Sequence, residues 1–570
     1  MKKNILSRMQ FLKFACLATV LTVFGACAPV AVPAPAVEAP AATSAPAATS
    51  APEATAAPTA AVAPEPERGG SIVFAHEQKP NSLDANVWTA TNAARIMRSI
   101  YDPLVWQSEG GVFVPGLAEK WEKSADDKTY TFWLRKDVKF HDGTPFDAAA
   151  VKATFDRIVD PATKSLQSGR IGPYESSEAV DTHTIKVQFK EPYNAFLNAL
   201  SEVALAPASP TAIRTLGDVY MRNPVATGPF RVQKWMDDNT LVLERNPDYA
   251  WGPAFLENKG AAYLDTITYR FVPEPATRMI ALETGEVQII DSPPPEEVVR
   301  LTGSAEYVVK KLVVPGMAEH MGLNVTRFPT SELSVRQAMQ YGVDRKALVE
   351  LIFFGQFPPG TGLLTSGSWA FSPEVAKMYP YDKAKAKQVL EADGWKMNAE
   401  TKIYEKDGKP LTLRQVTTSG GPTQKAAEFV QASLKEIGFD YQVEAMLYDA
   451  TVKRMADNDY EVSRLWFALS DPHDAFFMAL HSTQITAGGR FNRSRVEDPK
   501  LDGLIQKGID EEDNAKRVEI YNELHKYVME QAYLLPVYDG TLRHVMTSKL
   551  QGFKTDLLGR PYLVDFWMMK

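Results

Sequence analysis

Residues 115–146 read PGLAEKWEKSADDKTYTFWLRKDVKFHDGTPF, and this stretch decides the fold class. Its middle part, residues 129–134, alternates polar side chains with aromatic or aliphatic ones, which is the pattern of a β-strand with one buried face. Residues 141–145, His-Asp-Gly-Thr-Pro, then combine residue types that favour a tight turn. The stretch therefore predicts a half-buried strand that is followed by a turn.

Further strands and helices are predicted on both sides of this stretch. Strand patterns occur at residues 72–75, 184–189, 230–232 and 241–243, the last two flanking a turn at 237–239. Helical periodicity occurs at residues 335–349, 384–392 and 515–530, with Asp382 as the N-cap of the second. No unit of 20 to 50 residues repeats in the globular part, which excludes a solenoid or a propeller. The fold class is mixed α/β.

Length and charge restrict the possible partners. The chain has 570 residues, more than one hydrophobic core usually supports, so we expect two or three packed units. Lys and Arg number 62 against 70 Asp and Glu, a net charge of −8. A chain without excess positive charge does not attract phosphates, so nucleic acid is not expected as a partner.

The N-terminal segment has the features of an export signal. Lys2, Lys3 and Arg8 precede an apolar run from Phe14 to Ala26, which is shorter than the about 20 apolar residues that a membrane span requires. We therefore interpret residues 1–26 as a signal peptide.

The residues 23–27, Val-Phe-Gly-Ala-Cys, resemble a bacterial lipobox, in which the cysteine is lipidated and becomes the mature N-terminus. Cys27 would then carry the acyl chains that hold a bacterial lipoprotein on a membrane. The alternative is a plain secretory signal that is cleaved after Ala26. Residues 27–67 are rich in Ala, Pro, Thr and Ser and predict a disordered tether.

Patterns that would support catalysis were sought and not found. The sequence has no nucleophile elbow, no phosphate-binding loop of the Walker type and no His-Glu-x-x-His helix. Both cysteines, Cys16 and Cys27, precede the globular part, and the closest histidines, His473 and His481, are too far apart for adjacent helix turns. We therefore predict neither an enzyme nor a metal or cofactor site.

Several segments resemble a known family when they are taken together and in order. Residues 115–122 and 130–146 closely resemble the signature of the extracellular solute-binding protein family 5, the peptide-, oligopeptide- and nickel-binding components of ABC importers. Further segments follow in the order of that family, and the resemblance spans roughly residues 69–560. They are residues 226–230, 243–249, 285–287, 335–338, 343–345, 381–386 and 535–538, with Asn324.

The resemblance implies a two-lobed α/β fold of the periplasmic-binding-protein type, with a hinge and an additional inserted domain. It assigns residues 68–104, 203–315 and 535–570 to domain I, residues 105–202 to domain II and residues 316–534 to domain III. Arginines in the matching segments, among them Arg245 and Arg345, are expected to pair with acids such as Asp248 or Asp344 and to support the scaffold.

The resemblance also implies two ligand-binding stretches. Main-chain groups of peptide-binding relatives clamp the ligand as an added strand. Those stretches correspond here to two sets of residues, namely Trp88, Thr89, Ala90, Thr91 and Asn92, and Leu465, Trp466 and Phe467.

One acid of the relatives is missing from the second stretch. The relatives carry an aspartate three residues after the tryptophan that pairs with the ammonium group of the peptide, and this sequence lacks it. Because an unpaired buried ammonium costs several kcal/mol, either Asp471 or Asp474 replaces that aspartate, or the ligand has no ammonium group.

The resulting functional hypothesis is a solute-binding subunit of an ABC importer that captures di- or oligopeptides by lobe closure and delivers them to the permease. Alternatives are an oligosaccharide, on which Trp88, Trp466 and Phe467 would stack, a nickel chelate, a secreted hydrolase, and a chaperone-like or signalling role. We expect a monomer that is exported and is anchored by lipid on the outer face of the cytoplasmic membrane or in a periplasm.

Overall fold

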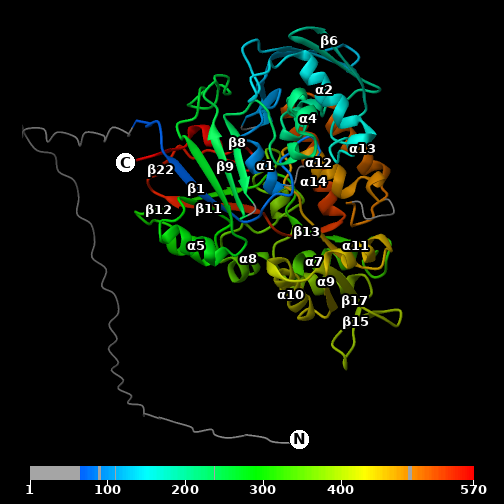
Figure 1. The fold of residues 1–570 in the computed structure, drawn as a ribbon. Coiled ribbons are helices and arrows are strands. Elements are labelled where there is room, and N and C mark those ends of the chain that lie inside the picture. The colour runs from blue at the N-terminus through cyan, green and yellow to red at the C-terminus, as the bar shows by residue number, and fades with distance from the viewer. Residues whose placement is uncertain (1–64, 88–90, 109–110, 237, 486–490) are drawn as a thin grey trace, which may run out of the picture. The chain divides into compact units, whose positions relative to one another are not determined.

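The structure, a computed structural model, describes residues 65–87, 91–108, 111–236, 238–485 and 491–570. Its strands form three larger sheets, named sheets I, II and III here (Figure 1). Sheet I contains, in spatial order, β12 (Tyr307–Val313), β21 (Thr541–Thr547), β11 (Ile289–Asp291), β1 (Ser71–His76), β10 (Thr266–Phe271), β9 (Thr240–Arg245) and β8 (Phe230–Met236). Sheet II contains β4 (Ala118–Lys123), β5 (Thr129–Leu134), β7 (Thr184–Phe189) and β6 (Tyr174–Asp181). Sheet III contains β18 (Asp440–Met446), β17 (Thr412–Thr418), β19 (Val462–Leu465), β13 (Glu319–Leu323) and β20 (Leu534–Tyr538).

Shorter strands pair outside these sheets. They are β2 (Val105–Gln107) with β3 (Phe113–Pro115), β14 (Lys396–Met397) with β15 (Tyr404–Lys406) and β16 (Lys409–Pro410), and β22 (Leu550–Gln551) with β23 (Trp567–Met568).

Sheet II contains the stretch that opened the sequence analysis, and it confirms the predicted strand. Tyr130, Phe132 and Leu134 of β5 are buried, and their neighbours are more exposed. β5 pairs antiparallel with β7, where Phe132 lies opposite Ile185. Helix α2 (Ala148–Val159) covers one face and begins at Asp147, whose side chain accepts a hydrogen bond from the Ala150 amide. Together these contacts bury one face of the sheet.

Sheet I is parallel at its centre, because β1 pairs in parallel with both β10 and β11. Parallel strands require long connections, and the chain forms sheet II and helices α1 (Thr91–Met97), α3 (Phe196–Leu200) and α4 (Pro210–Leu216) between β1 and β10. Helices α5 (Pro275–Glu283) and α6 (Pro295–Leu301) pack in a separate apolar cluster with Val545 of β21. Helix α1 packs in the larger cluster, which includes Ile72 and Phe74 of β1.

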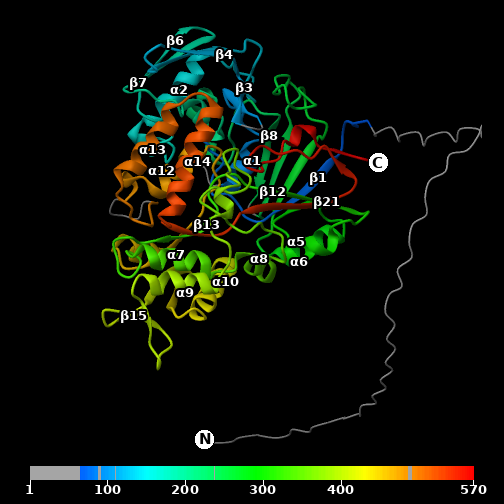
Figure 2. The same ribbon diagram turned by 180° about the vertical axis from the view of Figure 1, so that it is seen from behind.

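Sheet III lies between two groups of helices, as both ribbon views show for β13 between α7 and α14 (Figures 1 and 2). One apolar cluster contains residues of α7 (Leu333–Gly342), α8 (Arg345–Phe353), α9 (Lys383–Ala392) and α10 (Gly421–Lys435). The other contains residues of α12 (Pro472–Leu480), α13 (Pro499–Asp510) and α14 (Asn514–Glu530). Helix α11 (Tyr448–Ala456) packs on Val416 of β17 in a small third cluster.

The predicted local elements are confirmed by the described residues. β1, β7, β8 and β9 cover the predicted strands, and residue 237 of the turn between β8 and β9 lies outside the described residues. Helices α7, α8, α9 and α14 cover the predicted helices, and Asp382 caps α9 by accepting from the Lys385 amide.

The expectation that Arg245 and Arg345 pair with Asp248 or Asp344 is wrong. Arg245 forms its ion pair with Asp265. Arg345 donates to the main-chain carbonyl groups of Pro536, Tyr379 and Gln340. Asp344 instead caps α8 by accepting from the Ala347 amide, and an acid that caps a helix already has donors. Both arginines support the scaffold in this way.

Two short connections join sheet I to sheet III. The first leads from Val313, at the end of β12, to Glu319, at the start of β13. The second leads from Tyr538, at the end of β20, to Thr541, at the start of β21. The amide of Val314 donates to the carbonyl of Gly540 at 2.9 Å, so the two connections are hydrogen-bonded to each other. We call them the hinge strands.

Candidate functional site

The carboxyl ends of the parallel strands in sheets I and III border the same hinge strands. In sheet I, β11 and β12 both pair antiparallel with β21, so they run in the same direction as each other. β1 is parallel to β11, so β1, β11 and β12 all end at the same edge, where β12 continues into the first hinge strand. In sheet III, β13 leaves the hinge antiparallel to β19 and therefore starts where β19 ends. Ligands of open α/β sheets bind outside the carboxyl ends of the strands. Two such edges therefore adjoin one hinge.

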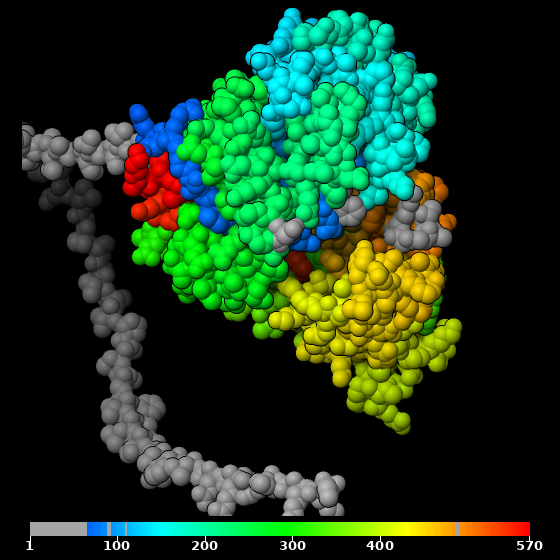
Figure 3. Space-filling view, viewed as in Figure 1, coloured from blue at the N-terminus to red at the C-terminus, as the bar shows by residue number. Residues whose placement is uncertain are grey.

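Figure 3 shows a hollow at this place. Blue and green atoms border it on one side, yellow atoms border it on the other, and dark red atoms of the C-terminal part of the chain lie at its floor. Sheet III has a topological switch point at this edge. β17 is parallel to β18 on one side and to β19 on the other, and the connecting helices α10 and α11 lie on opposite faces.

The edge of sheet I carries a buried polar cluster. Asp291, at the end of β11, lies 3.3 Å from His76 Nε2 and 3.5 Å from Arg95 Nη1. Arg95 also lies 3.3 Å from Glu77 Oε1. Burial lowers the pKa of His76 and raises the pKa of Asp291. Because Arg95 belongs to the last turn of α1, these contacts attach that helix to the sheet.

The first predicted ligand-binding stretch leads into α1. Trp88, Thr89 and Ala90 lie outside the described residues. Thr91 and Asn92 form the first two positions of α1, and their side chains also lie outside the described part of the chain. The backbone of Thr91 and Asn92 is therefore held beside the polar cluster by Arg95, one helical turn further on.

The second predicted stretch leaves sheet III beside the hinge. Leu465 is the last residue of β19 and is buried. Phe467 then accepts a hydrogen bond from the Met317 amide at 2.9 Å, and the Leu469 amide donates to Pro315 at 3.0 Å. Gly316 lies opposite Ala468, and a Cβ at Gly316 would lie 2.5 Å from the Leu469 nitrogen. Only glycine permits this close approach.

These contacts use one edge of the segment 466–469. In an antiparallel pairing, the N–H and C=O groups of alternate residues point to opposite sides. Phe467 and Leu469 point to the hinge strand, so the main-chain groups of Trp466 and Ala468 point to the other side. The Trp466 ring packs on Gly540, where a Cβ would lie 2.7 Å from its Nε1 atom. The segment is thus a fixed strand with one open edge.

Asp471 already has two strong partners. Its carboxylate accepts from the His473 amide at 2.8 Å, which makes it the N-cap of α12. It also forms an ion pair with Arg517 Nη2 at 2.8 Å. A carboxylate that caps a helix and pairs with an arginine is a structural group. Asp471 is therefore the weaker of the two predicted ammonium partners.

Asp474 has no ion-pair partner within 4.0 Å among the described residues. Asn198 Nδ2 of α3 donates to its carboxylate at 3.4 Å, and Asn198 Oδ1 accepts from Ser470 Oγ at 3.0 Å. Burial and the nearby charge of Asp471 raise the pKa of Asp474 to about 7. Asn198 and Asp474 therefore form a contact between the part of the chain that contains sheet II and the part that contains sheet III.

Further contacts connect the same two parts. Lys123 of β4 pairs with Glu512, and the side chain of Asn194 donates to the Ile509 carbonyl at 3.4 Å. A cavity of about 490 Å³ lies between these contacts and is lined by residues from both parts, Asp471 included. Asn194 and Asn198 were not predicted as functional residues, because a single Asn in a sequence has no pattern that indicates its partner.

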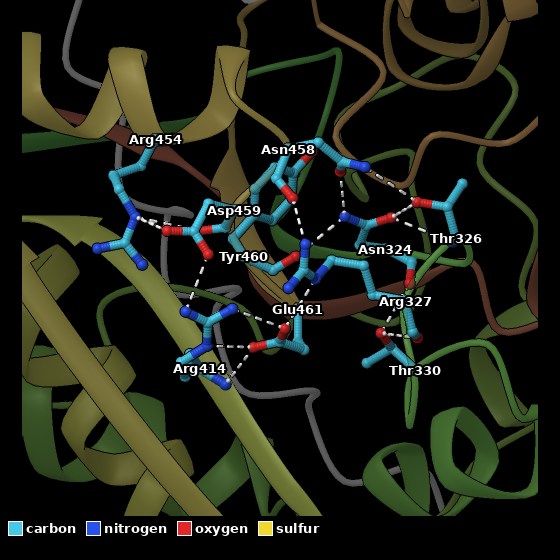
Figure 4. Close-up of polar contacts among 10 residues, drawn as sticks. All are labelled: Asn324, Thr326, Arg327, Thr330, Arg414, Arg454, Asn458, Asp459, Tyr460 and Glu461. Atoms are coloured by element: carbon cyan, nitrogen blue, oxygen red, sulfur yellow. Dashed lines mark hydrogen bonds and ion pairs between the residues drawn. The ribbon is translucent and has the colours of Figure 1, made fainter.

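A second charge cluster lies at the opposite end of β19 and is fully paired (Figure 4). Glu461 accepts from Arg327 Nε at 3.0 Å and from Arg414 Nε at 2.9 Å. Asp459 pairs with Arg414 at 2.9 Å and with Arg454 at 2.7 Å. This cluster joins the amino-terminal ends of β17 and β19, and it leaves no unpaired group for a ligand.

The described residues contain neither a metal-binding cluster nor a membrane-spanning helix. No group of three or more His, Cys, Asp or Glu side chains there is arranged to hold a metal ion. No helix there is long and apolar enough to cross a membrane.

Comparisons with known proteins agree with this geometry. A family model described as "Bacterial extracellular solute-binding proteins, family 5 Middle" matches residues 112–487. The glutathione-binding protein GsiB of Escherichia coli (strain K12) is 28% identical over 489 residues, which cover 85% of this chain and 91% of that protein.

Solved structures of similar proteins have the same fold. NikA from Brucella suis in complex with Fe(III)-EDTA is 25% identical, with a TM-score of 0.77, over 88% of this chain and 100% of NikA. DppA from Helicobacter pylori in complex with the peptide STSA is 27% identical, with a TM-score of 0.72, over 88% of this chain and 99% of DppA.

Together with the family model, this α/β fold defines the protein class as an extracytoplasmic solute-binding protein, the substrate-binding component of an ABC transporter. The chain belongs to the bacterial extracellular solute-binding proteins of family 5. The proteins of this family bind solutes and are not enzymes.

Proposed function

We propose that this protein captures short peptides, closes its two lobes around them and delivers them to the permease of an ABC importer. The observation that carries the proposal is the open main-chain edge of residues 466–469 beside the hinge. A peptide that adds to such an edge gains main-chain hydrogen bonds whatever its side chains are.

The second support is Asp474, an acid without an ion-pair partner within 4.0 Å among the described residues. A peptide ammonium group needs a carboxylate when it is buried, and of the two predicted acids Asp474 is the one that is not already paired with an arginine. The DppA relative binds the peptide STSA, and the GsiB relative binds glutathione, a compound of three amino acids. Both facts favour a peptide-like ligand.

The division into domains remains a proposal as well. All strands of sheet I fall within the three segments of domain I, and those of sheet II fall within residues 105–202. β20 belongs to sheet III, which supports a boundary after Tyr538 in place of residue 535. The hinge strands at 314–318 and 539–540 would then connect the lobes.

The N-terminal segment lies outside the described residues. We keep the proposals that residues 1–26 are a signal peptide, that Cys27 is lipidated and that residues 27–67 are a tether. An anchored and mobile binding protein would remain close to its permease, and this arrangement fits repeated docking by a monomer.

The test is native mass spectrometry of the purified protein, followed by denaturation to identify any released ligand. A set of short peptides is the expected result. A sugar, or a metal chelate, would contradict the proposal. If the protein is purified without ligand, a thermal-shift panel of di- and tripeptides replaces the first measurement. A peptide at 100 times its Kd should stabilise the protein by about 2.7 kcal/mol, and the absence of stabilisation by any peptide would contradict the proposal.

A further inference from the structure

Arg493 is an arginine of low exposure that lies on sheet III, and its side chain has no partner among the described residues. Arg493 has only 8% of its surface exposed. Its side chain forms no hydrogen bond and no ion pair with any of the described residues, and its Nε atom is completely buried. Its Nη1 and Nη2 atoms are open to solvent, and only the Nε donor is both buried and unpaired. A buried donor without an acceptor is costly. Such an arrangement persists where another role compensates for the cost.

Three other buried arginines, Arg278, Arg345 and Arg560, have several partners each. Arg278 donates to four main-chain carbonyl groups, and Arg345 donates to three and to the Gln340 side chain. Arg560 pairs with two acids, Glu202 and Asp556. Arg493 therefore differs from the arginines that support the scaffold.

The position of Arg493 is fixed by its backbone. Its carbonyl accepts from the Tyr460 hydroxyl at 3.0 Å, and its amide donates to the Phe491 carbonyl at 2.9 Å. Gly322, in the middle of β13, permits its close approach, since a Cβ at Gly322 would lie 2.8 Å from the Arg493 Cβ. Arg493 therefore lies directly on the sheet, in a place made by the missing side chain of Gly322.

The surroundings of Arg493 belong to the ligand-binding edge. Phe491 contacts the ring of Phe467 edge to face, with 4.9 Å between the ring centres. Burial lowers the pKa of Arg493, and the phenols of Tyr460 and Tyr448 act in the opposite direction. Tyr448 begins α11 directly after the carboxyl end of β18. Through the contact of Phe491 with Phe467, the segment that contains Arg493 packs beside the carboxyl end of β19.

The same edge exposes apolar surface. Leu447 is 77% exposed and Tyr448 is 68% exposed, although both are large apolar or aromatic side chains. An exposed apolar group beside a cation without a partner is the combination that a small organic anion would cover. The two observations are independent, because one concerns charge and the other concerns exposed apolar surface.

We propose that Arg493 is an anion subsite of the ligand-binding edge, and that the transported solute carries a carboxylate that pairs with it. The inference rests on the proposed function and adds the charge of the ligand to it. The carboxylate comes either from the C-terminus of a peptide or from an acidic side chain, and the two sources require different probes.

The test combines three dipeptides with two proteins. The probes are Ala-Glu, Ala-Gln and the C-terminal amide of Ala-Gln, and their affinities for the wild type and for Arg493→Met are measured by isothermal titration calorimetry. Within at least one pair of probes that differ by a single carboxylate, we expect the wild type to bind the probe with that carboxylate at least tenfold more tightly. Arg493→Met should bind the two probes of that pair equally. If the wild type binds Ala-Gln more tightly than its amide, the carboxylate that pairs with Arg493 is the C-terminus of the peptide. If it binds Ala-Glu more tightly than Ala-Gln, that carboxylate belongs to an acidic side chain. A wild type without any preference, or a variant that keeps it, overturns the proposal.

A measurement without ligand separates this inference from the proposed function. Removing the buried, unpaired Nε donor should stabilise the protein, so the urea midpoint of ligand-free Arg493→Met should exceed that of the wild type. The matched control is Arg327→Met, which removes a paired arginine and should lower the midpoint. If no dipeptide binds the wild type, the proposed function fails, and the urea midpoint alone then decides on Arg493. A lower midpoint of Arg493→Met would show a structural role and overturn the subsite.

Discussion

The two acids beside the proposed ligand-binding edge, Asp471 and Asp474, differ in how many hydrogen-bond and ion-pair partners they have among the described residues. Asp471 is paired with an arginine and with a helix terminus, whereas Asp474 is held by one amide of Asn198. Both acids lie within four positions of each other in the sequence, and no local pattern separates them. Their roles differ because Arg517, which follows 46 positions after Asp471, reaches only the first of them.

The raised pKa of Asp474 predicts a pH-dependent effect of its removal. Because the pKa in the folded protein is raised from its ordinary value to about 7, the folded protein binds a proton there more tightly than the unfolded chain. The group stabilises the protein below its ordinary pKa, and this contribution is lost as the pH rises to about 7. We expect Asp474→Asn to have a higher Tm than the wild type at pH 8, and the difference to shrink towards pH 5.

Differential scanning calorimetry between pH 5 and pH 8 checks this prediction. Asp248→Asn is the matched control, because Asp248 is exposed and its removal eliminates the same charge from the surface. A difference between Asp474→Asn and the wild type that stays constant over this pH range would contradict the raised pKa.

At the scale of elements, the sequence predicts the strands, helices and caps that depend only on residues a few positions apart. The strands β5 and β7 and the helix α9 with its cap at Asp382 follow from alternation, periodicity and capping within a few residues. The parallel pairing of β1 with β10 joins Ser71 to Thr266, and no pattern within either strand predicts that partner. The lack of a partner at Arg493 was likewise not predictable, since it depends on Gly322, far away in the sequence.

The paired cluster in Figure 4 is an element-scale support that should be sensitive to mutation. Glu461 is buried and holds Arg327 and Arg414 together at the amino-terminal ends of β17 and β19. We expect Glu461→Gln to reduce the free energy of unfolding by about 2 kcal/mol, because two arginines lose their shared anion. Urea denaturation measures the effect.

The control for Glu461→Gln is Lys453→Gln, which breaks the exposed pair of Lys453 and Asp457. Exposed pairs contribute less than about 1 kcal/mol. Equal losses of unfolding free energy in the two variants would show that burial does not increase the contribution of Glu461 to stability.

At the scale of the whole molecule, the proposed closure of the lobes makes ligand affinity depend on contacts between the part that contains sheet II and the part that contains sheet III. Asn198 is such a contact, because it bonds to both Ser470 and Asp474. Contacts that differ between two states set the balance between them. We expect Asn198→Ala to weaken binding of the native ligand about five- to tenfold, corresponding to about 1 to 1.4 kcal/mol.

Isothermal titration calorimetry measures the loss, and small-angle X-ray scattering should show a larger radius of gyration for the ligand-free variant than for the ligand-free wild type. The control is Asn223→Ala, which removes a side-chain amide that donates to the Val219 carbonyl of its own turn. Unchanged affinity and unchanged scattering in Asn198→Ala would show that this contact does not contribute to lobe closure.

The hydrogen bond between Val314 and Gly540 restricts how the two lobes can move. Two separate connections would allow sheet III to slide, tilt and rotate independently of sheet I. Two connections that are bonded to each other should bend together, which favours rotation of one lobe against the other over sliding. With the lobe closure that we propose, each closing event then brings the outer faces of the lobes into a similar relative orientation. A permease that binds this orientation would recognise the loaded state whichever ligand produced it.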